Sequence, residues 1–555
     1  MVTRHHGKAT TIMLRTQNTF HTKLKAILKY LASHHPTSTG DTETTVAGIS
    51  LNSKTVGPGE LYAALAGAQH HGADYINQAL DAGAVAVLTD ASGATRVPEH
   101  VPAIVVDNVR GALADAAALI YGNVESQTPR VYGVTGTNGK TTTTYFLNAL
   151  LAELGQTTGL IGTIETRIAG VSVPSQFTTP EAPDLHRLIA RMREAGVESA
   201  AMEVSSHAMA YKRTFGLRYA VAGFTNLTQD HLDLHGSMDE YFAAKALLFA
   251  QGHSVGHVIT LNGGAEPQWG QQLADQVDDA VTLDLGPAAP VAEPTQAKAT
   301  WQVQDLEPAG LGHAFTLRHT SGFTATTTVD MPGKFNVANA ALAAVMVFTG
   351  HDREHWERIR TALGAKNPGP FASAVPGRME VIGSEPTVVV DFAHNPDGLT
   401  QALQAVNQSR VQHHGSRGRT IMVFGATGQR DTAKRPLMGR IAAEYADVVI
   451  VTDDDPHHED PAEIRHPVFE AAVAHAQVLD DGTEVVEIAP RADALAYAVQ
   501  IATPQDTILA AGRGHETHQD ISGQSFEIDD RVVLREALED HGFITNGPAS
   551  PRASD

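Results

Sequence analysis

Residues Gly133–Thr142 read Gly-Val-Thr-Gly-Thr-Asn-Gly-Lys-Thr-Thr, and this stretch decides how the surrounding chain folds. The apolar run 131–134 predicts a buried strand, and the pattern from about 141 to 154 predicts a helix. A glycine-rich loop between a strand and a helix lets backbone amides and the helix N-terminus bind phosphate. In such a loop Lys140 neutralises the outer phosphates, and Thr141 offers a hydroxyl to Mg²⁺. The stretch therefore predicts a nucleotide site.

The simpler alternative is a glycine-rich turn that binds nothing. The spacing differs from the generic Walker A pattern, because Val134 rather than a glycine stands five residues before Gly139. We favour phosphate binding because Gly-Lys-Thr falls at the predicted start of the helix.

Patterns on both sides of the loop predict three α/β domains in the 555-residue chain. We expect a small α/β N-terminal domain at 1–127, a central P-loop ATPase-like domain with a parallel sheet at 128–371, and a C-terminal Rossmann-like α/β domain at 372–555. Residues 366–377 contain three prolines and two glycines, which predicts a hinge. Residues 1–18 and the tail from 547 are expected to be poorly ordered.

Strand and helix patterns alternate in all three blocks. Strands are expected at 61–65, 84–89, 103–107, 199–204, 220–224, 257–261, 387–391, 419–424, 447–452 and 506–511, and helices at 75–82, 111–121, 436–445 and 492–501. Residues 314–329 are rich in threonine and phenylalanine, and we expect them to form an antiparallel appendage.

The composition argues against several classes of protein. With 40 basic and 62 acidic side chains the net charge is −22, which argues against nonspecific binding to nucleic acid or to an anionic membrane. There is no cysteine, so disulfides and thiolate metal sites are absent. The longest apolar runs are interrupted, so no membrane insertion is predicted. We expect a cytoplasmic monomer that binds small molecules.

Thr135–Thr141 after a short strand resembles the signature of the Mur ligases and of the related folylpolyglutamate synthases. Both groups use ATP to phosphorylate a carboxylate, and an amine then attacks the acyl-phosphate. The resemblance covers about residues 51–540 and implies that ATP and Mg²⁺ are the cofactors. It assigns ATP binding in the loop to Gly136, Thr137, Asn138, Gly139, Lys140, Thr141 and Thr142.

Three more residues resemble the family's catalytic and metal-binding set, which also includes Lys140 and Thr141. Glu203 ends a predicted strand, where a carboxylate beside a phosphate loop is placed to hold Mg²⁺. His231 matches a histidine that helps to bind a second magnesium ion, although its segment also reads as a polar loop. Lys245 matches a carbamylated lysine, and a carbamate turns a repelling cation into an anion that can face Mg²⁺. Without the resemblance, Lys245 would be read as a surface residue.

Other segments would complete the ATP site. Asn336 resembles a residue beside the adenine, although it equally suits a helix cap. Arg378 resembles an arginine that reaches the phosphates, and Asp391 resembles an aspartate that holds the ribose. The family more often has tyrosine at the position of Phe392, so a hydroxyl is missing here. ATP is then expected between the second and third domains, with closure about the hinge.

The first two domains carry residues that resemble the UDP-substrate site of the third amino-acid-adding type, MurE. The segment around Ser53 usually reads Asp-Ser-Arg, so Asn52 and Lys54 are departures. The paired hydroxyls before Pro180 equally suit a helix N-terminus. The matching residues are Leu51, Ser53, Thr178, Thr179, Ser205, Tyr211 and Arg213.

The incoming amino acid is expected at strand ends of the third domain, where an open α/β sheet binds ligands. Enzymes that add meso-diaminopimelate typically carry Asn-Pro-Arg, whose arginine clamps the extra carboxylate. This chain has Asp455-Pro456-His457, and three successive aspartates suit a cation, so L-lysine or ornithine is favoured. A histidine replacing the arginine keeps diaminopimelate as the alternative. By resemblance the amino-acid site is Arg430, Asp454, Asp455, His457, Gly512 and Glu516.

The expected function is ATP-dependent ligation of an amino acid to UDP-N-acetylmuramoyl-L-alanyl-D-glutamate in peptidoglycan synthesis. A ligase like folylpolyglutamate synthase is the nearest rival, but that group lacks a separate UDP-binding domain. An inactive nucleotide-binding partner is a second rival. The presence of Lys140, Glu203, His231 and Lys245 argues against it.

Overall fold

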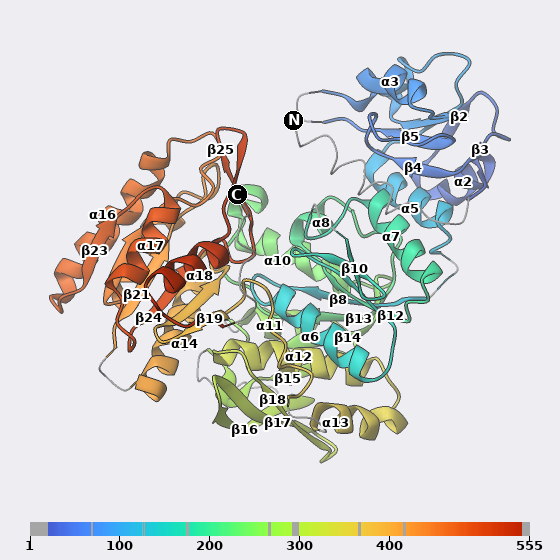
Figure 1. Ribbon diagram of the computed structural model, residues 1–555. Coiled ribbons are helices and arrows are strands. Elements are labelled where there is room, and N and C mark those ends of the chain that lie inside the picture. The colour runs from blue at the N-terminus through green and yellow to red at the C-terminus, as the bar shows by residue number, and fades with distance from the viewer. Residues whose placement is uncertain are drawn as a thin grey trace.

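The structure is a computed structural model, and it describes residues 20–67, 70–124, 126, 128–173, 177–264, 268–290, 299–364, 368–414 and 418–546. Three α/β units follow one another along the chain, coloured blue, then cyan to yellow, then orange to red in Figure 1. The extension expected at 1–18, the tail expected from 547 and part of the expected hinge lie outside the described residues.

The N-terminal unit contains β1 (Thr22–Lys23), α2 (Leu24–Tyr30), η1 (Ala32–His34), β2 (Thr37–Thr39), β3 (Thr45–Val46), β4 (Gly48–Ser50), β5 (Glu60–Ala64), η2 (Gly72–Tyr75), α3 (Ile76–Asp81), β6 (Ala86–Thr89), α4 (Ala91–Ala94), β7 (Ala103–Val105) and α5 (Val109–Ile120). Its sheet has the order β2-β7-β6-β5-β4, in which β2 is antiparallel to β7 and the other pairs are parallel. Apolar side chains of α2 and α5 pack on this sheet, together with Ala190 from the next unit.

The central unit contains β8 (Arg130–Thr135), α6 (Lys140–Glu153), β9 (Thr158–Ile161), β10 (Thr166–Ile168), β11 (Val171–Val173), α7 (Ala182–Glu194), β12 (Ser199–Glu203), α8 (Ser206–Ala210), β13 (Tyr219–Phe224), α9 (Leu232–His235), α10 (Met238–Ala246), η3 (Leu247–Phe249), β14 (Ser254–Thr260), α11 (Gln268–Gln276), β15 (Val281–Asp284), η4 (Gly286–Ala288), β16 (Trp301–Ala309), β17 (Gly312–His319), β18 (Thr324–Val329), α12 (Lys334–Thr349), η5 (Arg353–His355) and α13 (Trp356–Gly364).

One sheet runs through the whole central unit in the order β11-β10-β9-β12-β8-β13-β14-β15-β16-β17-β18. The strands from β9 to β16 are parallel, and both edges are antiparallel. The antiparallel pair expected at 314–329 is present as β17 and β18. It continues the central sheet through β16 instead of forming a separate appendage.

The C-terminal unit contains β19 (Glu380–Ser384), β20 (Thr387–Asp391), α14 (Pro396–His414), β21 (Thr420–Phe424), α15 (Lys434–Tyr445), β22 (Val448–Val451), α16 (Pro461–Leu479), β23 (Glu484–Glu487), α17 (Arg491–Ile501), β24 (Thr507–Ala511), β25 (His518–Ile521), β26 (Gln524–Glu527) and α18 (Asp530–Asp540). Its sheet has the order β19-β20-β24-β21-β22-β23 and is parallel except for β19.

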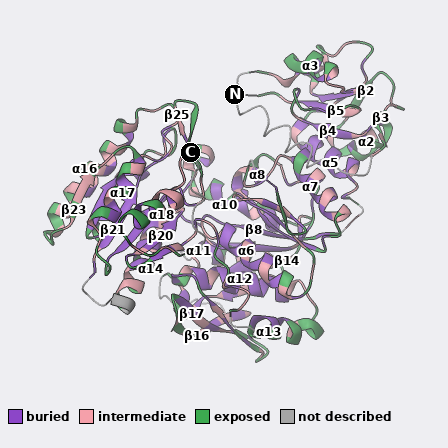
Figure 2. Cartoon of the chain, in the orientation of Figure 1, coloured by how far each residue is buried: buried purple, intermediate pink, exposed green. Residues whose placement is uncertain are grey.

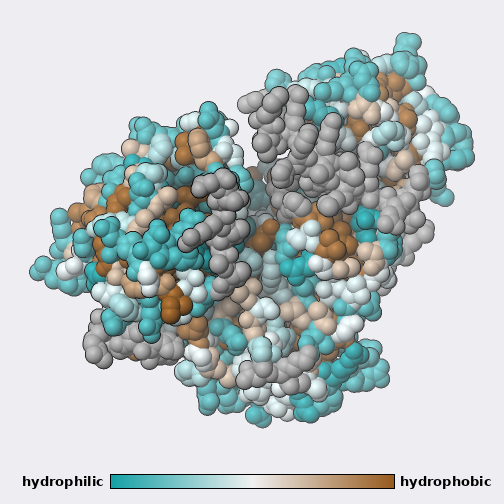
Figure 3. Space-filling model, viewed as in Figure 1, coloured by the Kyte–Doolittle hydropathy of each residue, from teal (hydrophilic) through white to brown (hydrophobic). Residues whose placement is uncertain are grey.

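The core explains why the apolar runs form strands. Most of the parallel strands are buried (purple in Figure 2), whereas the edge strand β23 is only partly buried. All the predicted strands and helices are confirmed. One contiguous apolar cluster joins the central and C-terminal units, and the Phe146 and Phe371 rings meet there at 5.0 Å. On the face shown in Figure 3 the surface is hollowed between the C-terminal unit and the other two.

Within the described residues, no helix is both long enough and apolar enough to cross a membrane.

Candidate functional site

The glycine-rich loop connects β8 to the first residue of α6, as predicted. Gly139 has φ +85°, and a Cβ there would lie 2.2 Å from Asn339 Oδ1, so only glycine fits. The Lys140 ammonium donates to the carbonyls of Gly136 (3.0 Å) and Thr137 (2.8 Å). Burial lowers the pKa of Lys140, the Glu203 carboxylate opposes this, and the net shift is downward. The lysine thus lies folded over its own loop, at the place where phosphates would bind.

Glu203, at the end of β12, lies directly beside the loop. Its carboxylate accepts hydrogen bonds from the Thr141 hydroxyl (3.0 Å), the Thr163 hydroxyl (3.0 Å) and the Thr163 backbone amide (2.8 Å). A hydroxyl and a carboxylate oxygen at hydrogen-bond distance are the oxygen ligands that Mg²⁺ prefers. The residues present therefore fit the predicted metal site.

Lys245 is buried and is not the surface residue that an alanine-rich helix alone would suggest. Its Nζ donates to Gly136 O at 2.6 Å and lies 4.4 Å from the centre of the Tyr241 ring. Burial and the nearby Lys140 cation hold the pKa of Lys245 well below its ordinary value. This shift favours the neutral amine, which is the form that reacts with carbon dioxide.

His231 lies across the domain boundary from the C-terminal unit. Asp230, His394 and Lys434 form one group with it. The Asp230 carboxylate lies 3.7 Å from His231 Nε2 and 3.8 Å from His394 Nε2. Burial raises the pKa of Asp230, but the nearby His231, His394 and Lys434 outweigh it, so the net effect is a lowered pKa. Burial lowers the pKa of His231, so its imidazole is neutral and able to bind a metal.

Arg378 reaches from the C-terminal unit into the phosphate loop. Its guanidinium donates to the Thr141 hydroxyl at 3.4 Å, and its Cζ lies 4.2 Å from the centre of the Phe392 ring. The phenylalanine that departs from the family's usual tyrosine therefore supports the arginine through its ring face. Asp391 accepts the backbone amides of Met379 and Ala393 at 2.8 Å, and burial raises its pKa. Its carboxylate orders the segment that carries Arg378.

A small cavity opens beside the loop between the central and C-terminal units. Asn339, Phe335 and Gln401 are among the side chains that line it, and Asn336 is not. The Asn336 amide is buried, donates to Pro332 O at 2.7 Å and accepts from Asn339 at 3.2 Å. Asn339 therefore lines the cavity, and Asn336 orients Asn339 by accepting its hydrogen bond.

The C-terminal unit also holds the side chain of Asn138. The Asn138 amide donates to Asp397 at 2.8 Å and accepts from Asn395 at 3.2 Å. These contacts tie the phosphate loop to the start of α14, so the loop and the C-terminal unit are positioned together.

The predicted UDP-site residues form two groups. Leu51 and Ser53 lie in the loop after β4, where the Ser53 hydroxyl donates to Gln78 at 2.9 Å. Near Glu203, the Thr179 hydroxyl donates to Glu203 O at 2.9 Å. The Thr178 hydroxyl accepts from Thr163 at 3.0 Å.

Ser205, Tyr211 and Arg213 lie beside the Thr178–Thr179 pair. Ser205 caps α8 by accepting the Ala208 amide at 3.2 Å. Arg213 pairs with Glu181 at 2.8 Å, and its Cζ lies 5.8 Å from the centre of the exposed Tyr211 ring.

The predicted amino-acid residues gather after β22 and β24. One carboxylate oxygen from each of Asp454, Asp455 and Glu516 lies within 4.8 Å of the other two. Gly512 has φ +108°, and a Cβ there would lie 2.6 Å from Asp454 Oδ2, so glycine makes room for the carboxylate. Burial and then Asp454 raise the pKa of Glu516 to about 8. The fully buried Arg513, which the sequence analysis gave no role, pairs with Asp455 at 2.7 Å.

His457 lies at the edge of this acidic group, whereas Arg430 lies in the segment after β21. The His457 ring is turned toward Asp520, with 3.0 Å between Nδ1 and Oδ2. Arg430 is exposed, and it is close enough to lower the pKa of His207 in the central unit, a shift caused mainly by burial. Arg430 therefore faces the cleft between the two units.

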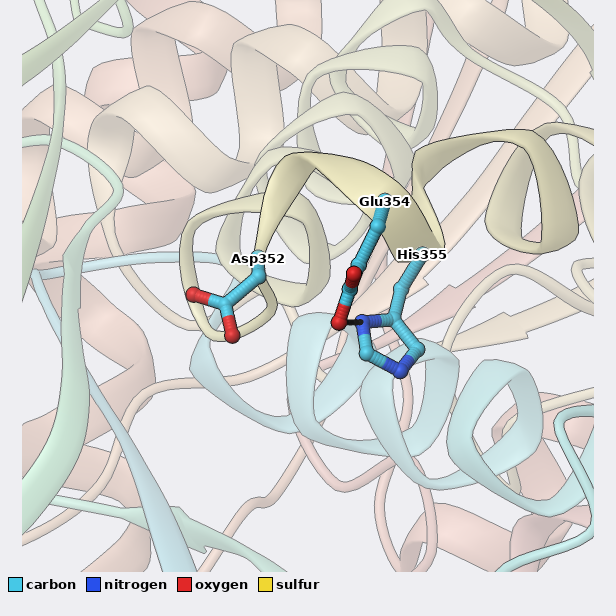
Figure 4. Close-up of side chains that lie close together, drawn as sticks. All are labelled: Asp352, Glu354 and His355. Carbon is cyan, nitrogen blue, oxygen red and sulfur yellow. Dashed lines mark ion pairs between the residues drawn. The ribbon is translucent and has the colours of Figure 1, made fainter.

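Another group of possible metal ligands, Asp352, Glu354 and His355, lies on η5 (Figure 4). All three side chains are exposed, and the Glu354–His355 pair is 3.9 Å long. Exposed acidic groups of this kind are ordinary surface features, so we assign this one no role.

Family models match all three units of the chain. The model described as Mur ligase family, catalytic domain, matches residues 45–121. The Mur ligase middle domain matches 134–347, and the Mur ligase glutamate ligase domain matches 377–514. A UDP-N-acetylmuramoyl-L-alanyl-D-glutamate–2,6-diaminopimelate ligase of Corynebacterium efficiens is 41% identical over 507 residues, which is 90% of this chain and 91% of the relative.

The chain belongs to the Mur ligase family.

Other relatives of this Mur ligase agree with that assignment. A ligase of the same name from Streptomyces avermitilis is 38% identical over 92% of this chain and 96% of its own length. A UDP-N-acetylmuramyl-tripeptide synthetase of Leifsonia xyli is 39% identical over 90% of this chain and 93% of its own length. These names confirm the predicted MurE resemblance and the predicted class of enzyme, an ATP-dependent ligase that forms a carbon–nitrogen bond.

Solved structures confirm the three-domain fold. A UDP-N-acetylmuramoyl-L-alanyl-D-glutamate–2,6-diaminopimelate ligase superposes with a TM-score of 0.62 at 28% identity, over 94% of this Mur ligase and all of that chain. Escherichia coli FolC in complex with DHPP and ADP has a TM-score of 0.53 at 17% identity, and this match covers 73% of the chain and 90% of FolC. The latter likeness concerns the fold alone.

Proposed function

We propose that this Mur ligase joins 2,6-diaminopimelate to UDP-N-acetylmuramoyl-L-alanyl-D-glutamate at the expense of ATP, in peptidoglycan synthesis. The observation that carries the proposal is the contact of Arg378 with Thr141, which sets the amino-acid unit against the phosphate loop. The names of the relatives supply the substrates. We place the domain boundaries near residues 127 and 371, so that the N-terminal domain binds the uridine.

The reaction needs positioning and charge neutralisation rather than a protein nucleophile. One of the two glutamate carboxylates of the UDP substrate takes the γ-phosphoryl group of ATP, so that an acyl-phosphate and ADP form. Lys140 and Arg378 neutralise the charge that develops on the transferred group. The amine of the amino acid then attacks the acyl carbon, loses a proton and displaces phosphate, which leaves an amide. Holding the reactants in line is the main contribution of the three domains.

The loop residues Gly136 to Thr142 would bind the phosphates of ATP, and the cavity beside Asn339 suits the base. Thr141, Glu203 and His231 would hold Mg²⁺ together with Lys245 as a carbamate. The ion would supply positive charge for the phosphoryl oxygens.

Carbamylation of Lys245 is supported by its burial and its lowered pKa. When such an amine is unprotonated it can add carbon dioxide and release a proton, and the resulting carbamate is an anion suited to a magnesium site. Activity should therefore fall when dissolved carbon dioxide is stripped from the assay, and it should return when bicarbonate is added. Activity that is indifferent to bicarbonate, with unmodified Lys245 in a native mass spectrum, would refute this step.

The identity of the amino acid differs from the preference stated in the sequence analysis. L-lysine was favoured there, whereas the relatives' names support the alternative, 2,6-diaminopimelate. The exposed Arg430 at the cleft is a cation that could bind the extra carboxylate in place of the missing arginine. L-lysine or ornithine remains a second candidate, because His457 is turned toward Asp520 and three carboxylates gather beside it.

The test offers the UDP dipeptide and ATP with diaminopimelate, lysine or ornithine in separate reactions and measures phosphate release. The proposal expects release with diaminopimelate, and a loss of that activity in Arg430→Ala. Activity with lysine or ornithine alone would transfer the assignment to the second candidate. No release with any of the three would overturn the ligase assignment.

A further inference from the structure

Two arginines from different domains meet at the boundary between the N-terminal and central units, and only one of them was expected there. Arg110, in the first turn of α5, lies 3.7 Å from Glu181, and Arg213 pairs with the same carboxylate at 2.8 Å. The Tyr211 ring centre lies 5.1 Å from Arg110 Cζ and 5.8 Å from Arg213 Cζ. A single carboxylate thus faces two guanidinium groups, which leaves a net positive charge.

The guanidinium of Arg110 is available to a ligand. Its side chain is 40% exposed, and within the described part of the chain it makes no hydrogen bond. Arg213 is less exposed, but its Nε is buried without a hydrogen-bond partner. An arginine that stacks on an aromatic ring while its donors stay unused is arranged to bind an anion.

Arg110 and Arg213 lie between the two ends of the substrate site, and this position indicates which anion they would bind. Arg213 Nη1 donates to Thr179 O at 3.4 Å, and the Thr179 hydroxyl donates to the backbone carbonyl of Glu203 at 2.9 Å. At the other end, α5 carries Arg110 on the unit that contains Ser53, and α5 packs against α7. A UDP substrate that runs from the Ser53 loop to Glu203 has to cross this boundary. Its diphosphate is the anion next to the uridine, on the N-terminal side of that path, whereas the two glutamate carboxylates lie at the opposite end of the substrate.

We infer that Arg110 binds the diphosphate of the UDP substrate, together with Arg213, and that Glu181 and Tyr211 hold the two guanidinium groups in place. The inference rests on the proposed function. It adds Arg110, on α5 of the N-terminal unit, to the residues proposed for the substrate site.

The test compares Arg110→Ala with Arg96→Ala. Arg96 is the matched control, because it is an arginine of the same unit with similar exposure (44%) that pairs with Asp74 at 2.9 Å. Loss of a charge-assisted hydrogen bond should raise the KM for the UDP substrate by about tenfold or more in Arg110→Ala. The KM for ATP should not change, and Arg96→Ala should match the native enzyme. Equal behaviour of the two variants would overturn the inference.

A second variant and two simple ligands distinguish diphosphate binding by Arg110 from a purely structural role. If the Arg110–Glu181 pair only joined the domains, Glu181→Gln would raise the KM as Arg110→Ala does. The inference expects the opposite, a lower KM, because removing the carboxylate frees positive charge for the diphosphate. Inhibition by UDP should weaken in Arg110→Ala, whereas inhibition by uridine should not. A failure of the proposed function itself would appear as an inactive native enzyme, so the two failures are distinguishable.

Discussion

The raised pKa of Glu516 makes a quantitative prediction about amino-acid binding. Burial and the neighbouring Asp454 raise this pKa to about 8, so at pH 7 only about a tenth of the free enzyme carries an ionised Glu516. The ammonium of the incoming amino acid that does not react should bind the ionised form, because that form supplies the pairing charge. A rise in pH ionises Glu516, so amino-acid binding should improve as pH increases toward 8.

The size of the effect follows from the same value. The ionised fraction grows from about one hundredth at pH 6 to about one tenth at pH 7 and one half at pH 8. The KM for the amino acid should therefore fall about tenfold from pH 6 to pH 7 and about fivefold from pH 7 to pH 8. The KM for ATP, measured in the same buffers, should show no such slope.

The assay is phosphate release at saturating ATP and UDP substrate, with amino-acid titrations at each pH. Glu516→Gln should give a high KM that is flat between pH 6 and pH 8. Glu527→Gln, which changes an exposed glutamate of the nearby β26, is the matched control and should keep the native slope. A native KM that does not depend on pH, or a slope that persists in Glu516→Gln, would refute the reasoning.

Three further predictions concern single side chains. Lys140→Ala should fold normally, as judged by circular dichroism, but should lose measurable turnover, and near-normal activity would remove the phosphate-loop assignment. Phe392→Leu should keep the fold and lower kcat about fivefold, because Arg378 loses the ring beneath it at a cost of about 1 kcal/mol, whereas Phe392→Tyr should retain activity. Asp530→Ala should lower the free energy of unfolding by about 3–5 kcal/mol in urea titrations, because it leaves the fully buried Arg491 unpaired, and a change under 1 kcal/mol would contradict this.

The sequence predicted the sheets well because their signals are local. Buried strands such as β8 and β20 are apolar runs, and the glycine-rich loop marks its own strand–helix junction. The edge strands β17 and β18 were placed correctly, but their attachment to the central sheet depends on β16, a pairing that no local pattern reveals.

The residues of the site could be predicted only where they belong to a recognisable sequence motif. Glu203 and Thr141 lie together as expected, because both follow neighbouring strands of one parallel sheet. The contact of Asn138 with Asp397 joins residues 259 positions apart, and Arg110 has no motif at all, so neither could be found from spacing. The preference for L-lysine as the substrate rested on the absence of one arginine from the Asp455-Pro456-His457 segment. A cation that folding brings to the site from another segment, such as Arg430, cannot be found from that segment alone.

The most direct test of the central claim is an isotope-transfer measurement. The UDP dipeptide is labelled with oxygen-18 at both oxygens of each glutamate carboxylate. The phosphate released during turnover with ATP and the accepted amino acid is analysed by mass spectrometry. Ligation through an acyl-phosphate predicts one labelled oxygen in each phosphate, because the carboxylate oxygen leaves with the phosphoryl group. Unlabelled phosphate would show that water attacks ATP instead, and it would contradict the proposed reaction.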